Sequence, residues 1–343
     1  MQQTRTIYFT SPWMPCGSFW LANCLLELGI KVSTYRKRGR DWRFDGTRHH
    51  VAEFSRFATL LPAFQDNDSF LFRPDIEVVW GHIFPYSHLH RHKVLLFTRD
   101  PRDAMYYQYL RERPYLDLSY QEWLHWPFHE SLLDKMDNWR LYHRLWEQHN
   151  DLAVFRFEDY CRNSARTLQR VLDFIGISVE PASFEHALWR SSYERYCAQK
   201  GRPFDPDKVR HDAWMRREGE EQAQLLIEQA AGTAMSRYRY LAKRVPLLPE
   251  PDPSTHMALN PFFHDIPLLR SKPSEDPATN LYVRKTLAFC KVYETGAHAN
   301  IFEKYRDLHT FRELDKNIGI YLHHARQVGL MKPAPMPVQE VCA

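Results

Sequence analysis

Glycine and metal-binding motifs are both scarce in this sequence. Only 12 of the 343 residues are glycine whereas 22 are proline, which indicates rigid turns. The cysteines form no CxxC pair and no cluster with histidine at metal-ligand spacing, which argues against a structural zinc site. In a chain of this size they indicate reduced intracellular thiols. They are Cys16, Cys24, Cys161, Cys197, Cys290 and Cys342.

Long apolar runs and a strong charge of either sign are also lacking. No stretch approaches the roughly 20 apolar residues that cross a membrane, and the first residues, MQQTRTIYFTSPW, lack the apolar core of a signal peptide. The net charge is only +4, and no basic stripe stands out, which argues against nucleic acid as a partner. With 44% hydrophobic and 14% aromatic residues, we expect a folded, cytoplasmic protein without a membrane span.

Apolar, strand-like runs alternate with helical patterns along the first half of the chain. Helices are expected before Gly29, from Pro101, and over 163–176 with a cap at Ser164. This alternation predicts an α/β fold, with a central, mainly parallel sheet flanked by helices. The expected strands are 6–10, 30–35, 76–82, 93–99 and 151–157.

The composition changes near Val245. We predict an α/β domain over residues 1–245, followed over 246–343 by a proline-rich linker and a mainly helical C-terminal extension. The extension contains no chemical motif. We expect it to pack on the main domain or to form a contact between copies of the chain, as in a homo-oligomer.

The stretch SPWMPCGSFWL, residues 11–21, joins the first expected strand to the first expected helix. A helix that begins near Gly17 presents unpaired N–H groups and its positive dipole end to an anion, and the Ser18 hydroxyl adds a donor. Pro15 and Cys16, however, stand where a phosphate-binding loop usually carries a cation. From this loop alone, a plain strand–turn–helix junction is the simpler interpretation.

Two polar residues follow other strands of the predicted sheet. His82 comes after a buried strand, and an imidazole there suits a general base, although a lone histidine is more often structural. Arg99 ends another strand. Its planar guanidinium could bind a phosphate through two donors, or Arg99 could belong to a surface cluster of ion pairs. Arg102 opposes the dipole of the next helix, so Asp100, Asp103 or an anionic ligand should offset its charge. The carboxyl ends of parallel strands share one edge, which predicts a common site.

Together these segments resemble the sulfotransferases that use 3′-phosphoadenosine 5′-phosphosulfate (PAPS). The resemblance covers roughly residues 5–240, and the motifs occur in the same order as in the family. RDPRD fully matches the family's R-[DN]-P-[KR]-D signature and is the most specific motif. GHIFP is similar to the K-T-H-L-P context of the catalytic histidine, and MPCGSFWL to P-K-S-G-T-T-W-L. FRFEDYCRNSARTLQRVLDFIG resembles the family's Y-E-D segment and its helix. QKGRPFDPDKVRHDAWMRR resembles, with stretched spacing, the late R-K-G-x-x-G-x-W loop.

The resemblance implies a P-loop-like sulfotransferase fold, PAPS as co-substrate and no metal. The acceptor would be a hydroxyl, with an amine as second choice, of a small molecule or carbohydrate. His82 would be the general base, and Ser18 would also act in catalysis. The implied co-substrate-binding residues are Cys16, Gly17, Ser18, Phe19, Trp20, Arg99, Tyr107, Phe157, Lys200, Gly201 and Arg202.

Three residues depart from the family pattern. Pro15 replaces the loop lysine, Tyr107 replaces a serine eight residues after the arginine, and Phe157 replaces a tyrosine. We expect another cation to reach the loop, with Lys200, Arg202 or the segment YRKRGR (35–40) as candidates.

Two other functions stay open at this point. The first is a degenerate relative that binds nucleotide, or nothing, and acts as an interaction protein through its C-terminal helices; Pro15 favours it. The second is a P-loop-like small-molecule kinase. This kinase is disfavoured because the sequence has no GxxxxGK[ST] motif and no clear acidic metal ligand after a strand.

Overall fold

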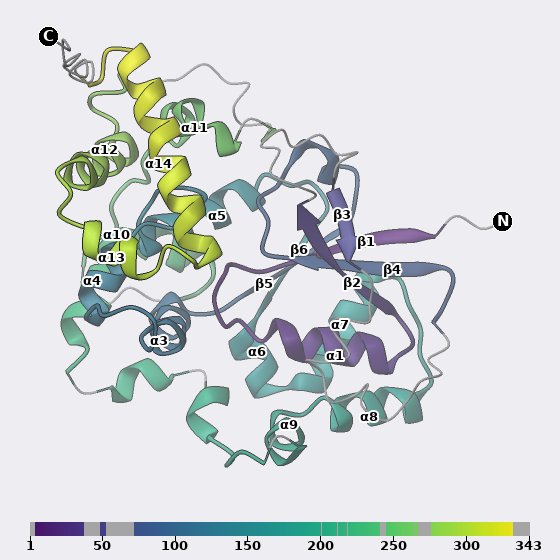
Figure 1. Cartoon of the computed structure of the whole chain (residues 1–343). Coiled ribbons are helices and arrows are strands. Elements are labelled where there is room, and N and C mark those ends of the chain that lie inside the picture. The colour runs from purple at the N-terminus through teal and green to yellow at the C-terminus, as the bar shows by residue number, and fades with distance from the viewer. Residues whose placement is uncertain are drawn as a thin grey trace, which may run out of the picture. The chain divides into compact units, whose positions relative to one another are not determined.

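The computed structural model describes two compact units, which we treat separately (Figure 1). The first comprises Met1–His125, Lys135–Glu250 and Asp265–Pro267, and the second comprises Trp126–Asp134, Pro251–His264 and Leu268–Ala343. The described residues are 4–37, 49–52, 72–199, 201–210, 212–217, 219–240, 245–263, 265–266 and 276–331.

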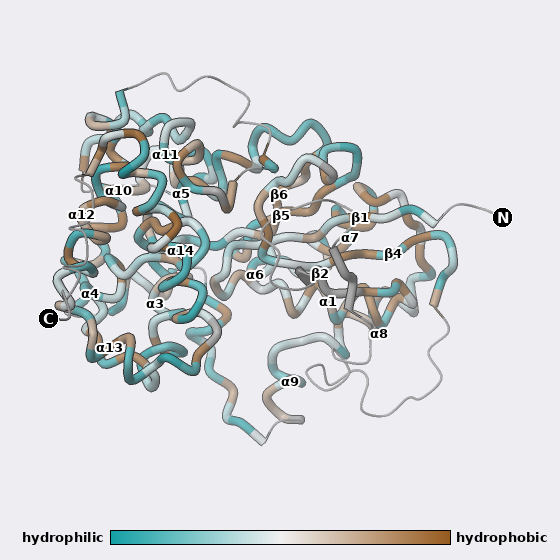
Figure 2. The backbone as a smooth tube through the Cα atoms, turned by 45° about the horizontal axis from the view of Figure 1, so that its top comes forward, coloured by the Kyte–Doolittle hydropathy of each residue, from teal (hydrophilic) through white to brown (hydrophobic). Residues whose placement is uncertain are grey.

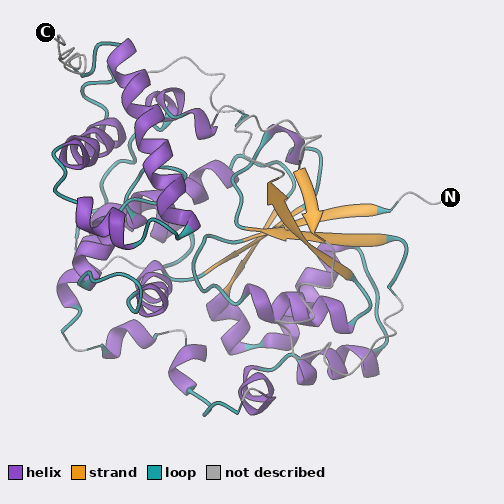
Figure 3. Ribbon diagram, in the orientation of Figure 1, coloured by secondary structure: helices purple, strands orange, loops and turns teal. Residues whose placement is uncertain are grey.

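The first unit is built on one sheet of six strands in the order β3-β2-β4-β1-β5-β6 (Figure 3). Every neighbouring pair is parallel except β2 and β3, which are antiparallel. The expected α/β class with a mainly parallel sheet is therefore confirmed. The strands are β1 (Arg5–Thr10), β2 (Lys31–Lys37), β3 (His49–Ala52), β4 (Ile76–Gly81), β5 (Val94–Thr98) and β6 (Leu152–Arg156).

Continuous apolar runs explain why the central strands are buried on both faces. Every residue of β5 is buried, and β4 is buried at Ile76 and from Val78 to Trp80. Figure 2, coloured by hydropathy, shows hydrophobic residues along β4. Strands that lose both faces to the protein interior read as unbroken runs rather than as alternating patterns. The expected strands at 76–82 and 93–99 agree with β4 and β5 to within one residue at each end.

Three helices bury apolar faces against this sheet in one core cluster: α1 (Ser18–Glu27), α7 (Ser164–Ile175) and α8 (Pro181–Arg190). Helix α7 ends at Gly176 in the left-handed conformation, as predicted. Its cap was predicted wrongly, because Asn163 rather than Ser164 accepts the Arg166 N–H at 2.8 Å. Ser164 is already the first helical residue.

Further helices complete the first unit. Helix α3 begins at Pro101, as its sequence predicts, with Asp100 as its cap. The α-helices are α3 (Pro101–Glu112), α4 (Tyr120–His125), α5 (Lys135–Trp146), α6 (Phe157–Arg162), α9 (Tyr193–Gln199) and α10 (Glu221–Arg237). Short 3-10 turns are η2 (Ser87–Leu89), η3 (Pro206–Val209) and η4 (Ala213–Arg216).

The second unit is helical, which confirms the helical extension expected at the C-terminal end. An aromatic cluster forms part of its core, in which Trp126 packs against Phe289 and Phe311. Trp126 belongs to a segment that precedes the rest of this unit by more than one hundred residues, so the predicted boundary near 245 stays a prediction. The elements are α11 (Ser254–Leu259), η5 (Pro261–Phe263), α12 (Leu281–Glu294), α13 (Ala299–Lys304) and α14 (His309–Gln327).

Candidate active site

The loop after β1 requires glycine at position 17. Gly17 caps α1 with a φ of 80°, in the left-handed region that other residues rarely adopt. A Cβ on Gly17 would lie 2.7 Å from Cδ2 of Phe157, at the start of α6. The tight approach of these two residues holds the loop against the end of β6.

The beginning of α1 offers backbone donors. The N–H groups of Gly17, Ser18 and Phe19 have no hydrogen-bond acceptor among the described residues. Such groups at a helix start can bind the oxygens of a phosphate or sulfate. The Trp20 N–H instead donates to the Gly17 carbonyl at 3.1 Å, and the Trp20 ring is buried against Tyr160. Trp20 is therefore a core residue.

Cys16 cannot serve as a charged group in this loop. Its thiol is buried, and burial raises its pKa to about 12, against the opposing charge of Arg99. The thiol is consequently neutral at physiological pH and is a poor nucleophile.

The sheet register brings His82 to Ser11. Thr10 of β1 is paired with Gly81 of β4, so the residues that follow them are neighbours. Nδ1 of His82 lies 2.9 Å from the Ser11 carbonyl oxygen and 3.2 Å from Ser11 Oγ. A carbonyl can only accept, so Nδ1 carries the ring proton and Nε2 is left with its lone pair. Burial lowers the pKa of His82, which keeps the imidazole neutral at physiological pH.

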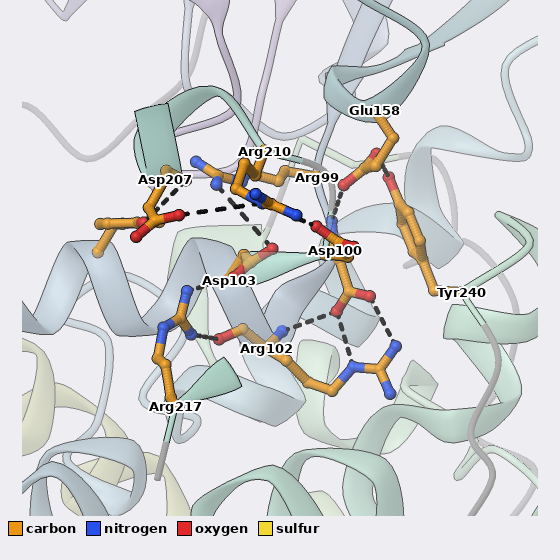
Figure 4. Close-up of polar contacts among 11 residues, drawn as sticks. Arg99, Asp100, Arg102, Asp103, Glu158, Asp207, Arg210, Arg217 and Tyr240 are labelled. Atoms are coloured by element: carbon orange, nitrogen blue, oxygen red, sulfur yellow. Dashed lines mark hydrogen bonds and ion pairs between the residues drawn. The ribbon is translucent and has the colours of Figure 1, made fainter. Parts of the chain in front are cut away.

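Arg99 lies buried between two aromatic rings. Its guanidinium is 4.1 Å from the centre of the Phe157 ring and 4.8 Å from that of Tyr107. Asp103 Oδ2 is 4.0 Å from Nη2, but neither Nε nor Nη2 has a hydrogen-bond partner among the described residues (Figure 4). Buried donors without partners are rare in folded proteins, so this guanidinium is suited to an anionic ligand.

Arg102, by contrast, is structural. It forms ion pairs with Asp100 at 2.7 Å and with Glu228 of α10 at 2.6 Å, and it stacks on Trp214. Asp100 does offset the charge of Arg102, as the sequence suggested. Glu228 lies 126 residues away and was not predicted as a partner.

Glu158 supports the turn that carries Arg99, a role that the sequence analysis did not predict. Glu158 accepts the Asp100 N–H at 2.9 Å and the Tyr240 hydroxyl at 2.7 Å (Figure 4). Burial raises the Glu158 pKa to about 7. Arg217 forms an ion pair with Asp103 and stacks on Tyr106. Only the pattern FED after a strand could have pointed to Glu158.

The remaining predicted residues differ in what surrounds them. Phe19 is exposed and lies edge-on to Trp80, and the Tyr107 hydroxyl donates to the Asp207 carbonyl at 3.1 Å. Gly201 and Arg202 are exposed. Lys200 and residues 38–40 lie outside the described part of the chain.

A family model for the sulfotransferase domain matches residues 77–211. These residues are similar to the sulfotransferase domain family. The resemblance drawn from the motifs is thereby confirmed, and the match supports sulfotransferase activity. It spans β4 to the late loop and contains His82, Arg99 and Phe157, whereas the loop at 11–21 lies before it.

Some solved sulfotransferase structures are similar to this chain at low sequence identity. A mouse sulfotransferase complexed with PAP is 13% identical to this chain, with a TM-score of 0.44. The match covers 69% of this chain and 89% of the mouse chain. Retinol dehydratase in complex with androsterone and inactive cofactor PAP is 14% identical, with a TM-score of 0.43 and coverages of 72% and 84%. A sulfotransferase from Alicyclobacillus acidocaldarius is 16% identical, with a TM-score of 0.35 and coverages of 62% and 100%. A comparison with curated protein sequences gives no match.

No helix within the described ranges is long and apolar enough to span a bilayer.

Proposed function

We propose that the protein transfers the sulfuryl group of PAPS to a hydroxyl of a small-molecule or carbohydrate acceptor. The observation that carries the proposal is the buried Arg99 guanidinium, whose Nε and Nη2 lack partners among the described residues. Its planar donors suit the 3′-phosphate of the nucleotide. The site lies where β1, β4 and β5 end side by side, which is where parallel sheets bind ligands.

The residues at this edge of the sheet have different roles in the proposed reaction. Nε2 of His82 accepts the proton of the acceptor hydroxyl, while the Ser11 carbonyl holds the other ring nitrogen. The acceptor oxygen then bonds to sulfur as the bond from sulfur to the 5′-phosphate oxygen breaks, releasing 3′,5′-adenosine bisphosphate. The N–H groups of Gly17, Ser18 and Phe19 stabilise the charge that develops on the phosphate oxygens.

Calorimetric titration with 3′,5′-adenosine bisphosphate, together with transfer of labelled sulfate from PAPS to an acceptor panel, tests the proposal. We expect binding by the wild type, loss of binding in Arg99→Ala, and loss of transfer with retained binding in His82→Ala. His186→Ala is the matched control, because His186 is an exposed histidine on α8. No binding by the wild type would overturn the proposal.

A second function, nucleotide binding without catalysis, is favoured by one observation: Pro15 occupies the position of the loop cation. Binding of the bisphosphate without sulfate transfer to any acceptor would support this function. Mg²⁺-dependent binding of ATP would instead support a kinase. Self-association through the C-terminal helices stays a separate prediction, checked by sedimentation of the full chain.

A further inference from the structure

Helix α5 carries two buried side chains whose polar atoms contact the segments at the ends of β1 and β4. Tyr142 and Trp146 are four residues apart, so they share one face of the helix. The Tyr142 hydroxyl forms a hydrogen bond with the hydroxyl of Thr10, the last residue of β1. The Trp146 ring N–H donates to the Ile83 carbonyl at 3.0 Å. Because Ile83 directly follows His82, α5 contacts the segment that carries the proposed base.

These contacts form a hydrogen-bond chain with a defined direction. The Thr10 hydroxyl donates to the Ile83 carbonyl at 3.4 Å. A threonine hydroxyl has a single proton, so Thr10 must accept from the Tyr142 hydroxyl. The Ile83 carbonyl therefore accepts from Thr10 and from the Trp146 ring, and α5 supports both donors.

The position of the His82 ring depends on this part of the backbone. The contact of Nδ1 with the Ser11 carbonyl, at 2.9 Å, determines which ring nitrogen carries the proton. A general base must also lie within hydrogen-bond reach of the hydroxyl that loses its proton. Rotation of the backbone at 82 and 83 would move Nε2 away from that place. The hydrogen bonds to the Ile83 carbonyl oppose such a rotation.

A third side chain anchors α5 to the strand that precedes Arg99. Nδ1 of His143 lies 2.7 Å from the backbone carbonyl of Trp139, so Nδ1 carries the ring proton. Nε2 of His143 then accepts from the hydroxyl of Thr98, the last residue of β5, at 2.8 Å. Burial lowers the pKa of His143 to about 3, which keeps the ring neutral. The helix is thereby fixed to the same sheet edge that carries the candidate site.

We propose that Tyr142 and Trp146 are positioning residues for the proton transfer, and that they hold His82 in place through the Ile83 carbonyl. This inference rests on the proposed function and adds residues that no sequence motif indicated. Both residues act through His82 and not on the nucleotide. Their loss should therefore lower the rate of sulfate transfer and leave nucleotide binding intact.

Removal of single polar groups tests this role. Tyr142→Phe removes only a hydroxyl, and Trp146→Phe removes the ring N–H but keeps an aromatic ring. For each variant we expect kcat for sulfate transfer from PAPS to fall about 10–100-fold, because a small misplacement of a reacting group is costly. The affinity for 3′,5′-adenosine bisphosphate, measured by calorimetry, should not change.

The same two substitutions elsewhere in the core are the matched controls. The Tyr120 hydroxyl and the Trp139 ring N–H are buried and have no hydrogen-bond partner within the described ranges. Tyr120→Phe and Trp139→Phe should therefore keep the kcat of the wild type. Melting temperatures of all four variants check that the fold is intact.

Combination with His82→Ala distinguishes an action through the base from a general structural effect. If Tyr142 acts through His82, Tyr142→Phe should lower kcat in the wild type but cause no further loss in the His82→Ala background. A further loss in that background, a parallel loss of nucleotide affinity, or an unchanged kcat would overturn this inference and leave the proposed function standing. A wild type that transfers no sulfate to any acceptor would overturn the proposed function and this inference together.

Discussion

Nδ1 of His82 lies 2.9 Å from the backbone carbonyl oxygen of Ser11. This contact joins the ends of two neighbouring parallel strands and determines which ring nitrogen can take a proton. It depends on backbone rather than on a second side chain, so few substitutions at Ser11 would remove it.

The pH profile of sulfate transfer should reflect the partly buried position of His82. Because burial lowers its pKa below 6.5, the neutral base persists as the pH falls through 6.5, and activity should decline only under more acidic conditions. His82→Ala should lose about 10²–10⁴-fold in kcat. Transfer rates between pH 5 and 9, taken as approximate limits, check this expectation. A midpoint above 6.5 would contradict it.

Gly17→Ala should impair both folding and nucleotide binding. The new Cβ would be 2.7 Å from Phe157, and the left-handed φ of 80° adds strain, so we expect destabilisation of roughly 2–4 kcal/mol. Chemical denaturation measures it. Gly319→Ala is the matched control, because its Cβ would meet nothing within 4 Å inside α14; it should stabilise by about 1 kcal/mol. Equal effects at the two positions would show that the Phe157 contact is unimportant.

Substitution by methionine should lower the stability at Arg102 but the nucleotide affinity at Arg99. Arg102→Met leaves the carboxylates of Asp100 and Glu228 buried without their partner and should cost about 3–5 kcal/mol of stability. Arg99→Met removes a buried charge with unpartnered donors, so stability should change little while nucleotide binding is lost. Denaturation curves combined with calorimetry separate the two cases. Similar losses of stability in both variants would argue that Arg99 is structural.

Glu158 should make the stability of the first unit depend on pH. Its folded pKa is about 7 against an ordinary 4.5, so the folded state holds the proton more tightly than the unfolded state. Its contribution is complete below pH 4.5 and is lost as the pH rises through 7, a difference of roughly 3 kcal/mol. Glu158→Gln keeps an acceptor for the Asp100 N–H and should flatten this part of the profile. Melting temperatures across this range measure the effect, and an unchanged slope in the variant would assign it to other groups.

Local patterns were sufficient to predict most elements of the sheet and the start of α3. The run VLLFT forms a buried strand because its apolar side chains favour burial on both faces of a sheet. Pro101 marks the start of α3 because proline fits the first turn of a helix and not its interior. The cap of α7 was missed because Asn163 and Ser164 are both good caps, and only the backbone geometry distinguishes them.

By itself, the sequence determined the α/β class, the strand ends that carry His82 and Arg99, and the absence of a lysine beside Gly17. Only the tertiary structure decided that Arg102 pairs with Glu228 and that Glu158 supports the turn before α3. Those outcomes depend on which distant segments pack together, and neither burial nor the approach of charges can be read from neighbouring residues. The physical reason is that strand and helix periodicity is local, whereas the desolvation and pairing of a charge are properties of the folded chain.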